Sequence, residues 1–387
     1  MKRCMQNSKT GLLSFAQHEG HNPWLDLLRT AAIFFVLLRH GSRFEGNGLS
    51  DGFLANISRN GWVGVDLFFV LSGYLIATGL IRRSGRNEGL FPKVYFRDRI
   101  LRIVPAYYAV LILCVAGVFP GMGPAATQDV VAHLLFLQDY TGSDINVVFW
   151  SLGVEEKFYI IAPLVVLLLL KLKGKAGFAT MAAALVLISP LCRGLTFEAW
   201  AEPISYDAFF ATMRSPFHMS LEGFLVGIMV GILRARGLAV PKSWALAGFG
   251  AAAIVLALWL GSHEFLAAIT RVDAWLAPTL LALLFGAMVF CAACLADRAL
   301  PIEPFFRVNA RLSYALYLVH YPLLPLAFAL ASQQHHSWFW AAYLLLSYAA
   351  ALAIHFGVEK PFLLLKQSLN PPAPKIAPTE PARAVLS

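Results

Sequence analysis

The sequence has few charged residues for its length. Only 14% of its 387 residues are Asp, Glu, Lys or Arg, whereas 58% are hydrophobic. A water-soluble globule of this size needs more polar surface than these residues supply, so the composition excludes an ordinary soluble enzyme. It also leaves no soluble catalytic domain, because no connection between apolar runs exceeds about thirty-five residues. We predict an all-α, polytopic helical bundle embedded in a membrane.

Several common signatures are missing as well. The sequence has no Gly-x-Ser-x-Gly elbow, no Walker loop and no His-Glu-x-x-His zinc pair, so we predict no metal site. Its five cysteines form no secreted disulfide framework, and Cys291-Ala-Ala-Cys294 lies in an apolar run, which favours small residues at a helix interface. Residues 1–22 are polar and contain no Ala-x-Ala-like site, so we expect no cleavable signal peptide.

Ten apolar runs are long enough, or nearly long enough, to cross a bilayer. They lie at about 24–40, 62–81, 102–119, 154–170, 176–192, 214–233, 243–261, 275–296, 309–331 and 338–358. We therefore interpret residues 23–366 as one membrane domain of about ten transmembrane helices. It follows an N-terminal segment, 1–22, and precedes a Pro- and Ala-rich tail, 367–387.

Lys and Arg gather in alternate connections between these runs. Cytoplasmic loops of membrane proteins hold the excess of positive charge, so both termini are assigned to the cytoplasm. The net charge of +9 then reflects topology, and we expect no nucleic-acid partner. The opposite side holds only six arginines, which are Arg39, Arg43, Arg59, Arg193, Arg214 and Arg271.

Arg29 and His40 both lie in the first apolar run. Eleven residues of α-helix rise roughly 16 Å over about three turns, so both side chains project from one face at different depths. Ionisable groups within a spanning segment are costly and mark functional sites. Imidazole can take and return a proton near neutral pH, so His40 is our candidate general base. A histidine at a helix end is more often structural, but Arg29 on the same face favours a site.

A basic connection runs from Arg82 to Arg102, with aromatic residues interleaved. It suits a phosphorylated, adenine-bearing ligand from the cytosol. Arg99 and Arg102 are neighbours on a helix face and can chelate phosphate oxygens, with Arg97 beside them. The alternative is a basic loop that only satisfies topology.

Asp66 lies within the second run and needs a partner. It could orient His40 or pair with an arginine. Deeper in the same run, Ser72 and Gly73 form a small step that could let a thin ligand pass close to the backbone, although helix packing explains it equally well.

Two further segments contain candidate residues. Glu155 and Glu156 are adjacent and point about 100° apart, so one is expected to pair with Lys157 or an arginine while the other serves the reaction. His320 precedes Pro322, which predicts a kink, and it is our second candidate histidine. The external connection Pro120–Ser151 has no Lys or Arg, and its hydrogen-bonding side chains suit a neutral polyhydroxylated acceptor, although an ordinary solvated loop looks the same.

Taken together, these segments resemble the acyltransferase-3 family of polytopic membrane O-acyltransferases, which modify bacterial surface polysaccharides and some small molecules. Tyr74 and Lys157 stand where the family is expected to have Phe and Gln, and some relatives carry an additional C-terminal esterase-like domain, which we do not expect here. The resemblance rests on Arg29-x10-His40, Gly64-Val-Asp-Leu-Phe-Phe-Val-Leu-Ser-Gly-Tyr-Leu-Ile76, Arg99-x-x-Arg102-Ile-x-Pro105, Trp150-Ser-Leu-x-Val-Glu-Glu-x-Phe-Tyr159, Ser313-Tyr-x-Leu-Tyr-Leu-x-His320 and Val358-Glu-Lys-Pro361.

The resemblance implies ten core helices, an acyl-CoA donor and roles for Arg29, His40 and the Arg99-x-x-Arg102 pair. We expect transfer of an acyl group, first of all acetyl from acetyl-CoA, to a hydroxyl of an exported polysaccharide or lipid-linked glycan at a bacterial plasma membrane. No permanently bound cofactor is expected. The acyl group would pass to the acceptor directly, with His40 as base, or through an acyl-histidine.

Three alternatives remain open at this point. The acceptor could be a small hydroxylated molecule such as a macrolide. The buried charges could line the path of a transporter or flippase. The chain could also be a scaffold for glycan-assembly machinery, in which case Arg29, His40 and Arg99 would be dispensable.

Overall fold

The computed structural model describes residues 22–44, 49–84, 93–142, 145–198, 204–331 and 336–369. Within these ranges the regular structure is helical, and the one β feature is an isolated antiparallel bridge between Ile204 and Ile269. The predicted all-α class is confirmed for this part of the chain. The predicted cytoplasmic segment 1–22 and the tail 367–387 lie almost entirely outside the described residues.

Seventeen α-helices and five short 3-10 or π turns follow one another along the described ranges. They are α1 (Pro23–Ser42), α2 (Phe53–Arg59), α3 (Val63–Ser84), α4 (Lys93–Val115), α5 (Thr127–Leu134), α6 (Gln138–Thr141), η1 (Val147–Phe149), α7 (Trp150–Lys171), α8 (Lys175–Val186), α9 (Ile188–Phe197), α10 (Tyr206–Phe209), η2 (Phe210–Arg214), η3 (Phe217–Met219), α11 (Glu222–Ala235), α12 (Lys242–Ser262), α13 (Arg271–Cys294), α14 (Glu303–Val319), η4 (Tyr321–Leu323), α15 (Leu324–Ala331), α16 (His336–Ile354), η5 (His355–Glu359) and α17 (Lys360–Leu369).

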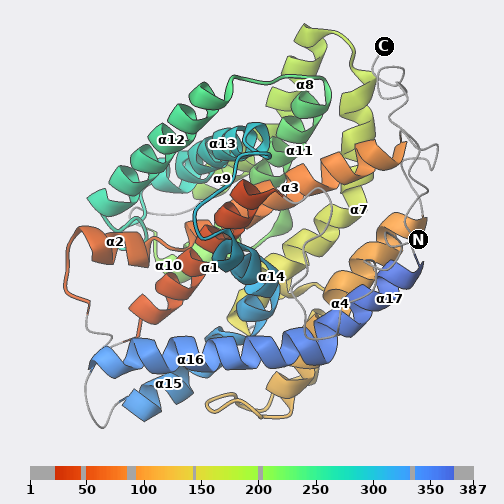
Figure 1. Ribbon diagram of the computed structural model, residues 1–387. Helices are drawn as coiled ribbons and strands as arrows, with labels where there is room; N and C mark the ends of the chain where they lie inside the picture. Colours follow the sequence, from red (N-terminus) through yellow and green to blue (C-terminus); the bar gives the residue numbers. More distant parts are fainter. Residues whose placement is uncertain are drawn as a thin grey trace.

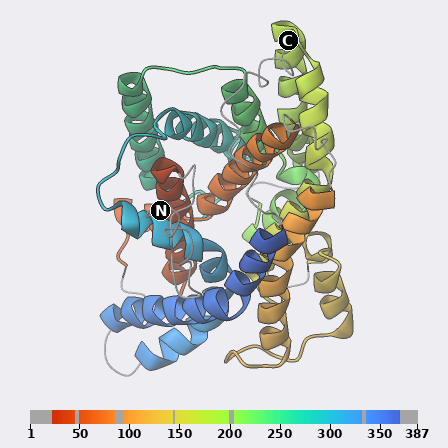
Figure 2. The ribbon, with the colours of Figure 1, turned by 45° about the vertical axis from the view of Figure 1, so that its right-hand side comes forward.

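Helices α1 and α3 lie toward the interior of the bundle, and α12 and α16 lie at its outside (Figures 1 and 2). α1 packs against α3, which follows it closely in the sequence, and against α14, which comes from the far end of the chain. The most apolar stretch of α3 is 61% buried, against 28% for α12. A charged side chain on α1 therefore faces other helices, whereas an outer helix presents most of its surface to the surroundings.

The start of α1 is fixed by its own sequence. Asn22 caps the helix, because its side-chain oxygen accepts from the backbone N–H of Trp24 at 3.0 Å and of Leu25 at 3.4 Å. Pro23 occupies the first helical position, where no N–H is needed. The Trp24 indole also donates to the carbonyl of Arg298 at 3.0 Å, which ties this end of α1 to the α13–α14 connection.

Helices α3 and α11 approach each other through glycines. A Cβ atom added at Gly73 would lie 2.0 Å from the carbonyl oxygen of Phe224, and one added at Gly227 would lie 2.1 Å from the carbonyl oxygen of Val70. Only glycine permits such an approach of two helix backbones. Gly73, which the sequence suggested as a ligand contact, therefore faces α11, and its neighbour Ser72 faces a cavity instead.

Five helical stretches in the described ranges are long and apolar enough to cross a membrane. They are α3, Lys175–Phe197, α12, α13 and Trp338–Leu369, and α14 with α15 gives a sixth if that pair is one span bent by 61°. The bend follows His320, where Pro322 predicts a kink. The ten spans and the cytoplasmic termini remain predictions. Four of the predicted spans are not among these stretches. Every membrane-length window of α1, α4 and α7 contains at least three charged residues, and α11 has only 14 residues.

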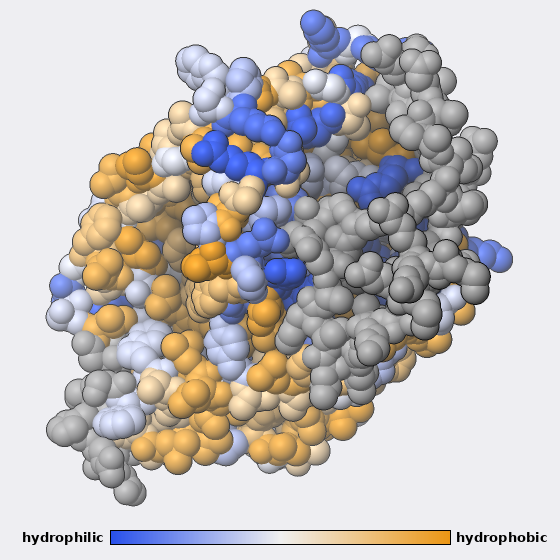
Figure 3. Space-filling model, viewed as in Figure 1, coloured by the Kyte–Doolittle hydropathy of each residue, from blue (hydrophilic) through white to orange (hydrophobic). Residues whose placement is uncertain are grey.

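Large apolar side chains cover much of the outer surface. Figure 3 shows hydrophobic residues over much of the left and lower parts of one face, with hydrophilic residues gathered mainly in its upper part. On α12, Trp244 is 72% exposed and Leu258 is 60% exposed, and on α16 Leu345 is 72% exposed. A surface of this kind is costly in water and favourable against lipid tails.

Candidate functional site

Two cavities adjoin inside the bundle beside α1. The first, of about 330 Å³, is lined by His40 and is called the His40 cavity. The second, of about 290 Å³, is lined by Arg29 and is called the Arg29 cavity. Val65 and Tyr317 line both cavities, so these two residues form the wall between them. The two ionisable residues of α1 thus open into neighbouring spaces, as their common helix face predicts.

His40 is hydrogen-bonded to the second candidate histidine. His40 Nδ1 lies 3.0 Å from Nε2 of His320, whose Nδ1 lies 3.0 Å from the carbonyl oxygen of Leu316. A carbonyl can only accept, so Nδ1 of His320 carries a proton, and in neutral His320 the Nε2 atom is then an acceptor. His40 must therefore donate through Nδ1–H, which leaves the lone pair of its Nε2 available as a base.

The surroundings of this pair restrict its movement. His320 is fully buried at the end of α14, and the ring of Tyr321 meets His40 edge-on at 5.1 Å between centroids. On the other side, the Tyr317 hydroxyl donates to the carbonyl of Val148 at 2.9 Å and lies 2.5 Å from the Ser151 hydroxyl. The wall between the cavities is therefore anchored to the start of α7.

The Arg29 cavity gathers three guanidinium groups. Arg99 and Arg102 of α4 line it together with Arg29, and Arg99 lies over the ring of Tyr159 at 5.0 Å. Three guanidinium groups against one carboxylate, that of Glu155, give the cavity a positive charge that favours an anionic ligand. The third predicted arginine, Arg97, does not line the cavity, and its Nη2 lies 3.4 Å from a carboxylate oxygen of Asp98.

The two adjacent glutamates have separate surroundings, as the helix geometry requires. Glu155 lines the Arg29 cavity, where it accepts a hydrogen bond from Ser72 at 2.6 Å and another from Tyr159. Glu156 does not line the cavity, and its Oε1 is buried without a hydrogen-bond partner among the described residues. We expected one glutamate to pair with Lys157 or an arginine. The pairing with Lys157 is wrong, because the Lys157 ammonium lies 2.5 Å from Asp139 instead, and no ion pair within the described residues joins either glutamate to an arginine.

Asp66 pairs with an arginine, the second of the two options that the sequence left open. Its carboxylate accepts two hydrogen bonds from Arg214, at 2.7 and 2.9 Å, and both residues are buried. The guanidinium also lies 5.2 Å from the rings of Trp62 and of Trp150. Arg214 lines the His40 cavity, while Asp66 does not and therefore acts through the arginine.

Sequence reasoning did not identify Arg214. The sequence pattern placed this arginine among the few positive charges on the external side, whereas in the structure only 6% of its surface is exposed. The signal that could have found it is the unpartnered Asp66, which requires a cation somewhere in the chain. The sequence offered several arginines and no way to choose between them.

The polar residues of the connection Pro120–Ser151 do not line the His40 cavity. Gln138 donates to the carbonyl of Phe149 at 2.7 Å, Asn146 donates to the carbonyl of Leu318 at 3.0 Å, and Asp139 is engaged by Lys157. Burial raises the pKa of the Asp139 carboxyl, and the hydrogen bond from Lys157 opposes that rise. The side chains of Gln138, Asn146 and Asp139 therefore hold the connection in place. The prediction that they line a site for a neutral acceptor is wrong for these three residues. Asp144 lies outside the described residues.

The fold and the site define a class of protein: an all-helical chain with membrane-length helices, in which a histidine pair and an arginine cluster serve two adjoining cavities. The chain belongs to the acyltransferase-3 family, because the family's model, described as an acyltransferase domain, matches residues 22–356. The predicted family membership is confirmed.

Among curated proteins, the chain resembles the peptidoglycan O-acetyltransferase OatA of Listeria monocytogenes. The two are 25% identical over 324 residues, which cover 79% of this chain and 49% of that protein. The O-acetyltransferase OatA of Staphylococcus aureus is 30% identical over 165 residues, which cover 38% of this chain and 25% of that protein. The chain thus spans half or less of these relatives. No solved structure matches it.

Proposed function

We propose that this chain transfers an acyl group, acetyl in the simplest case, from acyl-CoA to a hydroxyl group of a glycan at a bacterial plasma membrane. The observation that carries the proposal is the junction of the His40 cavity and the Arg29 cavity at Val65 and Tyr317. A two-substrate transfer needs separate donor and acceptor sites whose reactive ends meet. The family supports acyl chemistry, and the two OatA relatives support O-acetylation of a glycan.

The Arg29 cavity suits the donor. Guanidinium groups bind phosphate through paired hydrogen bonds, and the presence of Arg99 and Arg102 in the lining supports this assignment. The pantetheine arm then extends past Arg29 toward Tyr317, along the face of α1 that leads to His40. In this arrangement the donor enters from the cytoplasm and the acceptor from the opposite side, as the distribution of Lys and Arg predicts.

The histidine pair supplies the proton transfer. Nε2 of His40 takes the proton of the acceptor hydroxyl, and the oxygen attacks the thioester carbonyl. The new C–O bond forms as the C–S bond breaks, and the imidazolium returns its proton to the departing CoA thiolate. His320 is a positioning residue, because its hydrogen bond keeps the proton of His40 on Nδ1. Asp66 is also a positioning residue, because its carboxylate holds Arg214 at the His40 cavity.

Mass spectrometry of surface glycans tests this proposal. Cells with the gene should show glycans heavier by one acyl group, and mild base should remove that mass because it cleaves esters. Cells without the gene, or with His40→Ala, should lack it. His263→Ala is the matched control, because His263 is an exposed histidine outside both cavities. Acylated glycans in the His40→Ala strain would refute the proposal, and movement of substrate without acyl transfer would favour a transporter.

A further inference from the structure

Among the described residues that line the His40 cavity there are three arginines and no carboxylate. Arg39, Arg43 and Arg214 contribute the positive charge. Asp66 already neutralises Arg214 through two hydrogen bonds. The cavity therefore presents the charge of two further guanidinium groups, both from the last turn of α1 or directly after it.

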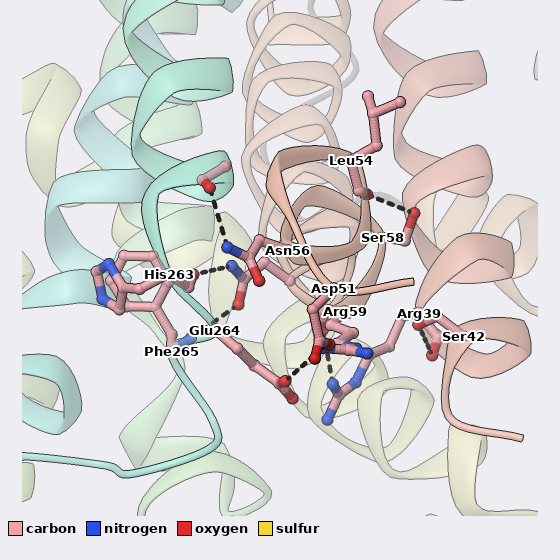
Figure 4. A network of polar contacts seen from close by, with 12 residues as sticks. Arg39, Ser42, Asp51, Leu54, Asn56, Ser58, Arg59, His263, Glu264 and Phe265 are labelled. Atoms are coloured by element: carbon pink, nitrogen blue, oxygen red, sulfur yellow. Dashed lines mark hydrogen bonds and ion pairs between the residues drawn. The ribbon is translucent and has the colours of Figure 1, made fainter. Parts of the chain in front are cut away.

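Only one of the two Nη atoms of Arg39 has a hydrogen-bond partner among the described residues. Nη1 donates to the backbone carbonyl of Arg59 at 2.6 Å, whereas Nη2 is buried without a hydrogen-bond partner among the described residues. Nearby carboxylates do not pair with Arg39, because Asp51 and Glu264 both approach Arg59 instead (Figure 4). Their oxygens lie 2.8 and 3.6 Å from Nη1 of Arg59. The Arg39 guanidinium therefore keeps its positive charge at the cavity without a carboxylate partner among the described residues.

Tyr206 brings the two arginines together. The Arg39 guanidinium lies 5.6 Å from the centre of the Tyr206 ring, and the Arg43 guanidinium lies 4.8 Å from it. Arg39 lies in the last turn of α1 and Arg43 directly follows the helix, so these two like charges repel each other, and no described carboxylate forms an ion pair with either. An anion bound between the two guanidinium groups would relieve this repulsion.

The rest of the lining is mostly aromatic. Trp62, Trp150, Tyr206, Phe210 and Tyr321 all face the His40 cavity. Aromatic rings pack well against the C–H faces of sugar rings and leave the hydroxyl groups free to point elsewhere. The cavity therefore combines a surface for a sugar ring, a base for its hydroxyl and two cations.

We infer that the acceptor is an anionic sugar, in which a carboxylate or phosphate group binds Arg39 and Arg43 while a hydroxyl of the same residue reaches His40. This inference rests on the proposed function, since it names the substrate class of the same site. It also replaces the neutral acceptor that the composition of the connection Pro120–Ser151 suggested, because the unneutralised charge of this lining comes from Arg39 and Arg43, which lie outside that connection.

Binding of three small probes to the purified full chain in detergent tests the inference. The probes are methyl β-D-glucuronide, glucose 1-phosphate and the neutral methyl β-D-glucoside, compared by isothermal titration calorimetry at one ionic strength. We expect at least one anionic probe to bind about tenfold tighter than the glucoside, because charge-assisted hydrogen bonds are the strong ones. The two anionic probes distinguish a carboxylate-bearing acceptor from a phosphate-bearing one.

Arg43→Gln should reduce this preference to within about threefold and leave the glucoside unaffected. Arg43 is exposed, so the variant should fold. Arg271→Gln is the matched control, because Arg271 is an exposed arginine that does not line the cavity. Equal binding of the three probes by the unmodified chain, or a preference that survives Arg43→Gln, would overturn the inference.

Binding separates this inference from the proposed function. His40→Ala should retain the preference for the anionic probe, since it removes the base and leaves both arginines. If that preference is present while glycans remain unacylated in cells, the function fails and the binding site stands. If glycans are acylated but all probes bind alike, the substrate class fails and the function stands.

Discussion

Replacing His40 and His320 singly and together tests whether they act as one unit. Loss of a general base costs about 10²–10⁴ in rate, so His40→Ala should lower acyl transfer by that factor. His320→Ala leaves the Nδ1–H of His40 without its acceptor at 3.0 Å. In the transition state the His40 ring carries a positive charge, and a hydrogen bond to a charged group contributes about 1.5–3 kcal/mol, so its loss should lower the rate about 10- to 150-fold at 1.36 kcal/mol per tenfold.

The double variant gives the decisive comparison. If His320 acts only through His40, the double variant should transfer no more slowly than His40→Ala alone, as happens for residues that act as a unit. Initial rates with radiolabelled acetyl-CoA in membranes, normalised to protein amount, measure this. His320→Gln should be milder than His320→Ala, since its amide oxygen can accept from Nδ1–H. Losses that multiply would refute the tautomer argument and would assign His320 a separate role.

Three further substitutions test other parts of the site. Arg102→Gln should raise the KM for acyl-CoA by about tenfold or more with little change in kcat, whereas Arg97→Gln, outside the cavity, should change it less than about threefold. Gly73→Ala should lower the thermal unfolding midpoint, since its Cβ would lie 2.0 Å from a carbonyl oxygen, while Gly79→Ala, with nothing within 4 Å, should leave it unchanged or higher. Tyr317→Ala should widen the junction of the two cavities, admit water to the thioester and raise acyl-CoA hydrolysis relative to transfer by about tenfold, whereas Tyr317→Phe should not. Unchanged ratios would show that this ring does not exclude water from the junction.

Much of the site could be predicted from the sequence because it depends on local geometry. Arg29 and His40 share one helix, and the same rise and periodicity that hold for any α-helix place them on one face. Arg99 and Arg102 are three residues apart, so both could be expected to face one ligand. The structure places all four beside the two adjoining cavities.

The remaining contacts could not be predicted because they join distant parts of the chain. Asp66 and Arg214 are 148 residues apart, and His40 and His320 are 280 apart. Local pattern shows that a buried charge needs a partner, and only the packing of the helices decides which one. Lys157 shows the same limit: a glutamate stands directly beside it in sequence, yet it pairs with Asp139 of another helix.

The charged residues of the cavity walls also explain why α1, α4 and α7 look less like membrane spans than α3 or α12. α1, α4 and α7 supply His40, the arginines of the Arg29 cavity and Glu155, and these charges lower their apolar character. Leaving either member of the Asp66–Arg214 pair without the other would cost about 3–5 kcal/mol, whereas apolar residues in both places are often neutral or stabilising. Stability alone therefore does not account for such a pair. The position of Arg214 in the wall of the His40 cavity does, because a guanidinium held by two hydrogen bonds and flanked by Trp62 and Trp150 is fixed in the same cavity as His40, the base that we propose.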